Sequence, residues 1–191
     1  LGEFGFRTPI YSVITNVAHT KNTHIPSYAK TANLSLAHKK DLGALYGVVH
    51  TKAEAKDAYE QLEKFGNAVL YQAVIQSDLE LLLGISRDPQ FGLYLAIGLG
   101  GSWTNVLSDR SYMFLPTTPR VMRQKLFHAS RYVIQQLGNE YKQNIVSQIV
   151  EHMQLLQRLM SKHPEIQELE INPLMINKEG IWVADVKIKT G

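Results

Sequence analysis

The sequence predicts an α/β (α+β) protein built from two α/β lobes with largely antiparallel sheets, and three observations predict it. First, apolar and polar residues alternate on both sides of the turn at Asn177–Gly180, as expected for a β-hairpin. Second, the apolar runs 80–86 and 93–99 are joined by a segment with Asp88-Pro89 and Gly92, residues typical of a turn between antiparallel strands. Third, three segments place apolar residues at helical spacing. We expect a smaller lobe over residues 1–70 and a larger lobe over residues 71–191.

Length and composition are those of a globular protein and argue against several classes. The chain has 191 residues, of which 45% are apolar and 19% charged, so it can bury a core. Its net charge is +3 and no run of Lys and Arg follows one periodic face, so nucleic acid is not indicated as a partner. No apolar run approaches the length of a membrane span and no signal peptide opens the chain, so we expect no membrane partner. The absence of cysteine leaves no disulfide framework, which fits the cytoplasm, the location we expect.

In the smaller lobe we expect three strands and one helix. The strands are expected at 10–14, in the stretch that leads into Lys30, and at 69–75, where apolar residues alternate. The segment 34–46 is cationic and is typical of a loop. A capping box at Thr51–Glu54 begins the helix and Gly66 ends it. Its apolar stripe is formed by Ala55, Ala58, Tyr59, Leu62 and Phe65.

In the larger lobe we expect two helices after a short strand at 103–107. Thr118 caps the first helix, which has Pro119 at its first position and ends at Gly138. The second helix runs from Asn139 to about Lys162, before a proline that cannot continue it. The apolar stripes of both helices, including their methionines, are expected to lie in the core.

The last hairpin carries the most specific signal. If Ile176 pairs with Ile181 across the turn, Asn172 lies opposite Asp185. Opposed side chains have Cβ atoms about 5 Å apart, so one small cation could touch both residues. Oxygen ligands of this kind suit Mg²⁺, which takes one or two protein oxygens and completes its shell with water and phosphate. The apolar residues expected to share the opposite face are Leu169, Ile171, Pro173, Met175, Trp182, Ala184, Val186 and Ile188.

A second interpretation of the same hairpin needs no metal. Its polar residues would form a solvated sheet face, with Glu170 and Lys187 as an ion pair and Asp185 in solvent. A connecting loop of different length would also shift the register and separate Asn172 from Asp185. The hairpin alone leaves both interpretations open.

Several short motifs follow one another along the chain in an order that indicates a family. They are Lys30, His38-Lys-Lys-Asp-Leu-Gly-Ala, Arg87-Asp-Pro-Gln-Phe-Gly, Gly98-Leu-Gly-Gly and His163-Pro-Glu-Ile-Gln-Glu-Leu-Glu-Ile-Asn-Pro. Together they resemble the ATP-grasp part of the NDP-forming acyl-CoA synthetases. That group includes ADP-forming acetyl-CoA synthetase and is related to the β subunit of succinyl-CoA synthetase. The strings cover nearly the whole chain, and the ordered set is more specific than any single string.

The resemblance implies an ATP-grasp fold, with the nucleotide between two lobes, and an acid–CoA ligase (NDP-forming) of which this chain is one part. In that family an acyl phosphate is made, its phosphate passes to a histidine on the CoA-binding part, and the ATP-grasp part interconverts ADP with ATP. The implied cofactors are ATP or ADP and Mg²⁺. The implied partners are CoA-binding domains, on the same polypeptide or on an α subunit. The chain begins without Met, and we expect it to be one domain of a larger protein.

The resemblance also implies roles for individual residues. It makes Asn172 and Asp185 ligands of Mg²⁺ with Glu170 beside them, and His38 a second histidine that relays phosphate to the nucleotide. The other implied nucleotide-binding residues are Lys30 and Lys39 at the phosphates, the backbone of Tyr71, Gln72 and Ala73 at the adenine edge, Glu80 at the ribose, Arg87 at a phosphate, and Gly100 and Gly101 where the backbone approaches the ligand.

Most of these residues also have a plainer interpretation. A lone histidine such as His38 is usually a surface residue, and Lys30 and Glu80 would then be solvated charges. Arg87 could pair with its neighbour Asp88 instead of a phosphate. The glycine pair could serve only a tight turn.

The chain departs from the family pattern at three positions. Ala44 stands where the family has a second glycine, Ala73 where an acidic residue is usual, and Asn105 where Glu is typical. A Cβ at position 44 restricts positive φ and the close approach of phosphate. Three hypotheses therefore stay open: a catalytic domain, a ligand-sensing module of a protein acetyltransferase, and a degenerate structural domain. The retained set of Lys30, Glu80, Asn172 and Asp185 favours the first, and Ala44 and Asn105 favour the other two.

Overall fold

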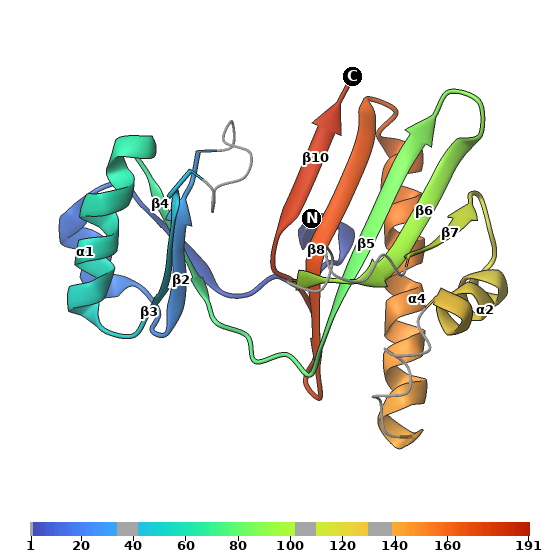
Figure 1. The fold of residues 1–191 in the computed structure, drawn as a ribbon, viewed down its shortest axis with the longest axis horizontal. Helices are drawn as coiled ribbons and strands as arrows, with labels where there is room; N and C mark the ends of the chain where they lie inside the picture. Colours follow the sequence, from blue (N-terminus) through green and yellow to red (C-terminus); the bar gives the residue numbers. More distant parts are fainter. Residues whose placement is uncertain (1, 34–41, 102–109, 130–138) are drawn as a thin grey trace. The chain divides into compact units, whose positions relative to one another are not determined.

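The chain folds into two compact units of mixed α/β structure (Figure 1). The computed structural model describes residues 2–33, 42–101, 110–129 and 139–191. One unit is Pro9–Ile75, and the other combines Leu1–Thr8 with Gln76–Gly191. Within the described residues every strand pairing is antiparallel, which confirms the sheet type expected from the sequence.

A four-stranded sheet forms the smaller unit, in the order β1-β4-β2-β3. Its strands are β1 (Tyr11–Ile14), β2 (Ser27–Thr31), β3 (Leu45–Val49) and β4 (Val69–Ala73). Helix α1 (Lys52–Leu62) and the 3₁₀ helix η2 (Val17–Asn22) pack on one face of this sheet. The core between sheet and helix is formed by Ile14, Ala29, Val49, Ala55, Ala58, Tyr59, Leu62, Val69 and Tyr71. Strand β3 begins at Leu45, inside the segment that the sequence presents as a loop.

Helix α1 begins and ends where the sequence predicts. The hydroxyl of Thr51 accepts the backbone N–H of Glu54 at 3.1 Å, and a carboxylate oxygen of Glu54 accepts the backbone N–H of His50 at 2.9 Å. Side-chain acceptors of this kind satisfy donors that the first helical turn leaves unpaired. The helix passes into the 3₁₀ turn η3 (Glu63–Phe65), and Gly66 ends it with a φ of 152°.

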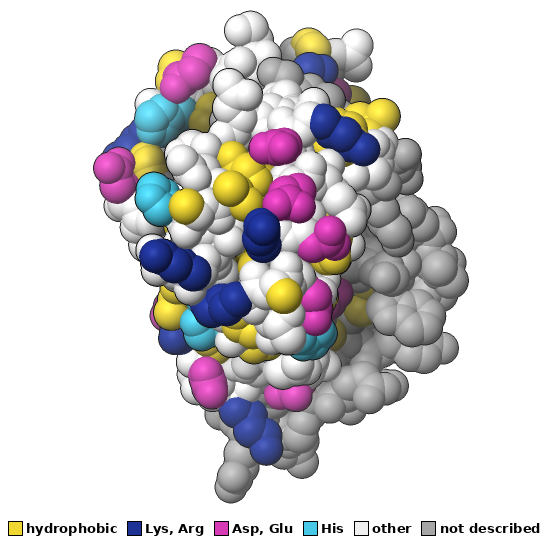
Figure 2. Space-filling model, turned by 90° about the vertical axis from the view of Figure 1, so that its left-hand side faces the viewer, with side chains coloured by type: hydrophobic (Ala, Val, Ile, Leu, Met, Phe, Trp, Pro, Cys, Tyr) yellow, Lys and Arg dark blue, Asp and Glu magenta, His cyan; other side chains and the backbone are white. Residues whose placement is uncertain are grey.

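The side of the molecule that carries α1 shows no single dominant charge. Figure 2 views this side, where basic and acidic side chains are interspersed and hydrophobic side chains are scattered. One pair on α1, Lys56 and Glu60, lies 3.7 Å apart at the helical spacing of four. Both side chains are exposed, so this ion pair contributes little to stability.

A six-stranded sheet forms the larger unit, in the order β10-β8-β5-β6-β7, with β9 paired to β8. Its strands are β5 (Leu79–Asp88), β6 (Gly92–Leu99), β7 (Arg110–Phe114), β8 (Ile166–Asn177), β9 (Gly180–Val183) and β10 (Val186–Thr190). Helices α2 (Pro119–Ala129) and α4 (Asn139–Lys162) pack on one face of the sheet, and the short 3₁₀ helix η1 is Gly2–Phe4 (Figure 1). None of the helices in the described segments has the length and apolar character that crossing a membrane requires.

The helices and the first hairpin of the larger unit agree with the sequence predictions. Strands β5 and β6 form the expected antiparallel hairpin, and α4 has the expected bounds. Thr118 caps α2, because its hydroxyl accepts the N–H of Val121 at 3.4 Å. Strand β7 was not expected. The strand expected at 103–107 and the part of the first helix expected over 130–138 lie outside the described residues.

The two faces of the larger sheet differ in what covers them. Leu81, Leu83 and Ile85 of β5 are fully buried in the core with α2 and α4. Successive side chains of a strand point to opposite faces, so residues between them in sequence lie on the other side. We call this second side the outer face; in β8 it carries Glu170 and Asn172, which flank the buried Ile171.

The C-terminal hairpin has the register that the sequence predicts. Ile176 pairs with Ile181 across a turn in which the Glu179 N–H donates to the side-chain oxygen of Asn177 at 2.8 Å. The same register continues into β10, where Glu170 lies opposite Lys187. A two-residue turn between alternating strands fixes such a register.

The prediction that one set of alternate residues fills the core along the whole hairpin is wrong. Leu81 pairs with Leu174, and Leu83 pairs with Ile171, so β8 has two residues where β5 has one. A bulge of this kind shifts the alternation by one position. The core side of β8 therefore passes from Leu169 and Ile171 to Leu174 and Ile176, which excludes Pro173 and Met175 from it. Ile188 also leaves the core; it lies on the edge strand β10 and is 51% exposed.

The N-terminal residues belong to the larger unit, whereas the sequence assigns them to the smaller lobe. Phe6 is buried in the core of the larger unit, with only 3% of its surface exposed. The N–H of Val183 donates to the carbonyl of Arg7 at 2.8 Å, and the Arg7 guanidinium lies 4.3 Å from the centre of the Trp182 ring. These contacts attach the segment to β9. The other boundary falls at Ile75, after β4 is complete, and not at residue 70.

Candidate functional site

Two glycines follow directly after β6, and their backbone lies close to the start of β5. The N–H of Gly100 donates to the carbonyl of Glu80 at 2.9 Å, which extends the β5–β6 pairing by one residue. A Cβ at position 100 would overlap the backbone of Leu81. Gly101 has a φ of 61°, and a Cβ there would overlap the carboxylate of Glu80. The glycines are therefore required by contacts within the protein, whatever approaches them from outside.

Asn172 joins this glycine turn to the C-terminal hairpin. Its side-chain oxygen accepts the N–H of Gly101 at 2.9 Å. Its own backbone N–H donates to the carbonyl of Asp185 at 3.2 Å. Asn172 is partly buried and Asp185 is exposed between β9 and β10. Val186 packs against the core, so Asp185 lies on the outer face with Asn172.

Glu80 lies on the same outer face, between buried residues at positions 79 and 81. The hydroxyl of Ser77 donates to its Oε1 atom at 3.1 Å. Its backbone carbonyl accepts Gly100, and its other carboxylate oxygen lies against Gly101. The side chain is thus held at the end of the glycine turn.

The residue types here match the magnesium site predicted from the sequence, of the kind that relies on phosphate and water; their role as ligands stays a prediction. Asn172 offers an amide oxygen and Asp185 a carboxylate, and Glu170 lies two residues before Asn172 on the outer face. Among the described residues no group of three or more His, Cys, Asp or Glu side chains forms a complete metal cage. Mg²⁺ is commonly bound by one or two carboxylates plus substrate phosphates, so these residues suit it and would not suit a metal that needs four protein ligands.

Arg87 lies away from this group and has structural partners. Its guanidinium donates to the carbonyls of Ile166 at 2.9 Å and His163 at 3.4 Å, and to that of Met160. These are carbonyls at the end of α4 and the start of β8, where a cation is favourable. The plainer alternative of an Arg87–Asp88 pair is not seen either, because Asp88 accepts the N–H groups of the following turn. We therefore leave Arg87 out of the candidate site.

The backbone of Tyr71, Gln72 and Ala73 is predicted from the resemblance to contact an adenine edge, and that role stays a prediction. These residues form β4, which lies between β1 and β2 and pairs with both. The N–H of Ala73 donates to the carbonyl of Ile10 at 2.8 Å. Strand β4 thus uses backbone groups on both sides for pairing within the sheet.

The side chain of Tyr71 is also part of the core. It is 1% exposed, and its hydroxyl donates to the carbonyl of Ala55 in α1 at 2.6 Å. Burial, with smaller effects from Tyr59 and Tyr46, raises the pKa of Tyr71 well above its usual range. Tyr71 is a core residue that joins β4 to α1.

The predicted phosphate-binding segment is described only in part. Lys30 lies on β2 between the buried residues Ala29 and Thr31, so it points to the face opposite α1. Its role stays a prediction. His38 and Lys39 lie outside the described residues. Ala44 is fully buried, and its carbonyl accepts the N–H of Thr31 at 3.0 Å.

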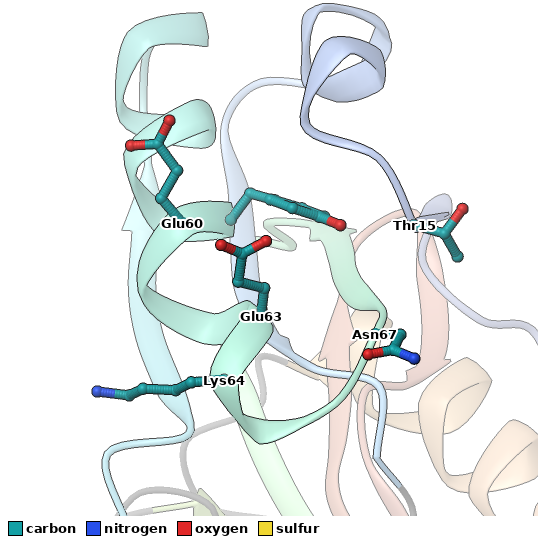
Figure 3. Close-up of a pocket in the computed structure, with 6 residues that line it drawn as sticks. Thr15, Glu60, Glu63, Lys64 and Asn67 are labelled. Atoms are coloured by element: carbon teal, nitrogen blue, oxygen red, sulfur yellow. The ribbon is translucent and has the colours of Figure 1, made fainter.

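A hollow on the smaller unit contains none of the predicted site residues. It has a volume of about 470 Å³. Its lining residues are Thr15, Tyr59, Glu60, Glu63, Lys64 and Asn67. In the close-up, the labelled side chains spread outward and do not converge on one point (Figure 3). We assign no binding or catalytic role to this hollow.

One contributor to the candidate site escapes the sequence analysis. Ser77 precedes β5 and orients Glu80 through its hydroxyl. Its spacing of three residues from Glu80 is the only signal in the sequence, and no rule attaches a role to that spacing outside a helix.

Comparison with known proteins identifies what the fold resembles. The profile of a family described as an ATP-grasp domain matches residues 3–190. ADP-forming acetate–CoA ligase I of Archaeoglobus fulgidus is 26% identical over 203 residues, which is 100% of this chain and 30% of the ligase. The beta subunit of ADP-forming acetate–CoA ligase I of Pyrococcus furiosus is 24% identical over 198 residues, covering 97% of this chain and 85% of that subunit. The chain thus spans less than a third of the Archaeoglobus ligase.

A solved structure shares the fold. The dinucleotide-forming acetyl-coenzyme A synthetase 1 of Ca. Korarchaeum cryptofilum, in complex with coenzyme A and Mg-AMPPCP, superposes with a TM-score of 0.81 at 21% identity. The match covers 100% of this chain and 88% of that one. In that structure the phosphohistidine segment points towards the nucleotide-binding site.

Proposed function

Because the chain belongs to the ATP-grasp domain family, we propose that it is the nucleotide-binding domain of an ADP-forming acid–CoA ligase, transferring phosphate between a phosphohistidine and ADP or ATP with Mg²⁺. The relatives from Archaeoglobus and Pyrococcus are ligases of this type, which supports the proposal. CoA-binding domains on the same polypeptide, or on a separate subunit as the Pyrococcus beta subunit suggests, are the proposed partners.

The hydrogen bond from Gly101 to Asn172 is the observation that carries this proposal. It joins Asn172 to the turn that lies against the Glu80 carboxylate, and the backbone N–H of Asn172 bonds in turn to the carbonyl of Asp185. Phosphoryl transfer depends on positioning and on neutralising charge more than on covalent help from the protein. The three residues supply a cation's oxygen ligands and an acceptor for ribose hydroxyls, which are the two requirements of a nucleotide site.

Each group has a defined task in the proposed reaction. Mg²⁺, when bound, neutralises charge on the phosphate oxygens. Asn172 and Asp185 orient it, Glu170 lies near them, and Glu80 accepts from the ribose. Lys30 and Lys39 bind the phosphates. His38 relays the phosphoryl group, since a neutral imidazole is nucleophilic near neutral pH.

Nucleotide titration tests the proposal directly. ADP and ATP are titrated into the chain with and without Mg²⁺, and binding that strengthens with Mg²⁺ is the expected result. Absence of binding of either nucleotide at millimolar concentration would overturn it. Turnover requires the CoA-binding domains, so His38→Ala is assayed in the full-length protein. Unchanged acyl-CoA-dependent ATP formation by that variant would exclude the relay.

A ligand-sensing module without turnover is the second candidate. Ala44 favours it, because this position is buried and its carbonyl pairs with β2, whereas the resemblance has a glycine of a phosphate loop there. Such a module would bind nucleotide in the titration, but the full-length protein would form no ATP. A degenerate structural domain would fail both measurements.

A further inference from the structure

Glu80 is held from two sides. The hydroxyl of Ser77 donates to Oε1 at 3.1 Å. The Oε2 atom occupies the space in which a side chain at position 101 would begin. The carbonyl of Glu80 accepts the N–H of Gly100 at 2.9 Å, which fixes the backbone as well. Because glycine has no side chain, position 101 leaves the space that the Glu80 carboxylate occupies.

The same glycine also holds Asn172. Its N–H donates to the Asn172 side-chain oxygen at 2.9 Å. This bond orients the amide of Asn172 on the outer face of β8. The backbone N–H of Asn172 donates to the carbonyl of Asp185, so the part of β8 from which this side chain extends is held in place.

We propose that Gly101 is a positioning residue that couples ribose recognition by Glu80 to cation binding by Asn172. It acts on Glu80 through the space it leaves and on Asn172 through its N–H group. Gly101 also adopts a φ of 61°, a backbone conformation that residues with a Cβ rarely adopt. The inference rests on the proposed function, and it replaces the sequence-based role of Gly101 as a point of close ligand approach.

Gly101→Ala is the test, and Gly92→Ala is its matched control. Gly92 begins β6 with a φ of 75°, so alanine costs similar backbone strain at both positions. A Cβ at position 92 would meet nothing within 4 Å, whereas at position 101 it would displace the Glu80 carboxylate. The difference between the two variants isolates that displacement.

Three ligands are titrated into the isolated chain with Mg²⁺: ADP, 2′-deoxy-ADP and 3′-deoxy-ADP. Wild type and Gly92→Ala are expected to prefer ADP to at least one deoxy nucleotide. Gly101→Ala is expected to bind ADP about tenfold more weakly and to lose this preference, because a misplaced carboxylate no longer accepts the ribose hydroxyl. The gain in ADP affinity on adding Mg²⁺ is expected to shrink as well. Simple loss of stability would weaken all three ligands alike.

Coupling through Glu80 is tested by combining Gly101→Ala with Glu80→Ala. Once the carboxylate is gone, alanine at position 101 has nothing to displace, so it should not reduce ribose preference further. If Gly101→Ala alone fails to fold, the double variant should restore folding. Failure of the double variant to fold, while Gly92→Ala folds, would overturn the proposal.

The remaining outcomes distinguish failure of this inference from failure of the proposed function. Wild type that binds Mg²⁺-ADP, with Gly101→Ala indistinguishable from Gly92→Ala, overturns the inference alone. Wild type that binds neither ADP nor ATP overturns both.

Discussion

The backbone N–H of Asn172 donates to the carbonyl of Asp185 at 3.2 Å, and both residues lie on the outer face of the larger sheet. The bond makes Asn172, which carries an amide oxygen, and Asp185, which carries a carboxylate, neighbours across the hairpin. A divalent cation bound to nucleotide phosphates needs no more than this from the protein.

Asp185→Asn should therefore weaken Mg²⁺-dependent nucleotide binding without changing the fold. The substitution keeps the shape and removes the charge, so the ADP affinity measured with Mg²⁺ should fall about tenfold, whereas affinity measured in EDTA should not change. Isothermal titration calorimetry checks both values. Glu168→Gln, at an exposed position of the same strand pair, serves as control. An equal loss in both variants would point to a general electrostatic effect.

Arg87→Met should destabilise the larger unit and leave nucleotide affinity unchanged. The guanidinium bonds to three backbone carbonyls beside α4, and their loss should lower the free energy of unfolding by about 2 kcal/mol. Chemical denaturation measures this change, with Arg120→Met at an exposed position of α2 as control. A variant of normal stability that binds ADP poorly would restore the phosphate role predicted from the sequence.

Tyr71→Phe should affect stability and not binding. It removes the hydroxyl that donates to the Ala55 carbonyl within the core, at an expected cost of about 1 kcal/mol. Tyr11→Phe, on a side chain that is 61% exposed, should cost almost nothing. Thermal unfolding compares the two variants, and ADP titration should give wild-type affinity for both. Weaker ADP binding by Tyr71→Phe alone would contradict a purely structural role.

His152 should make the larger unit less stable below neutral pH. Burial lowers the pKa of His152 below its usual 6.5, since its Nε2 atom has no hydrogen-bond partner among the described residues and its ring packs on Phe6. The unfolded chain therefore binds a proton more readily than the folded one, and stability falls as pH drops below 6.5 until the folded state protonates too.

Denaturation at a series of pH values checks this sign. His152→Leu should remove part of the decline between neutral and acidic pH, while His24→Leu, at an exposed position, should keep it. Identical pH profiles for His152→Leu and wild type would show that another group controls the decline.

The elements could be predicted where the pattern is local. The cap at Thr51, the stop at Gly66 and the bounds of α4 depend on residues within a few positions of each other, and all three agree with the structure. The site was harder to predict. Arg87 was assigned to a ligand because its motif matched a family, but its partners lie more than 70 residues away. The resemblance places Tyr71 at a hinge, and the sequence does not show that β4 is paired on both sides.

The sequence by itself determined that a pairing of Ile176 with Ile181 would bring Asn172 opposite Asp185, and the structure has this register. In a hairpin closed by a two-residue turn, one cross-strand pair fixes the partners of the residues that follow it. Only the tertiary structure decided that Gly101 lies between Glu80 and Asn172, and that the alternation in β8 shifts at Pro173. Gly101 lies 71 residues before Asn172 in the sequence, and packing between distant segments leaves no periodic trace in the sequence of either one.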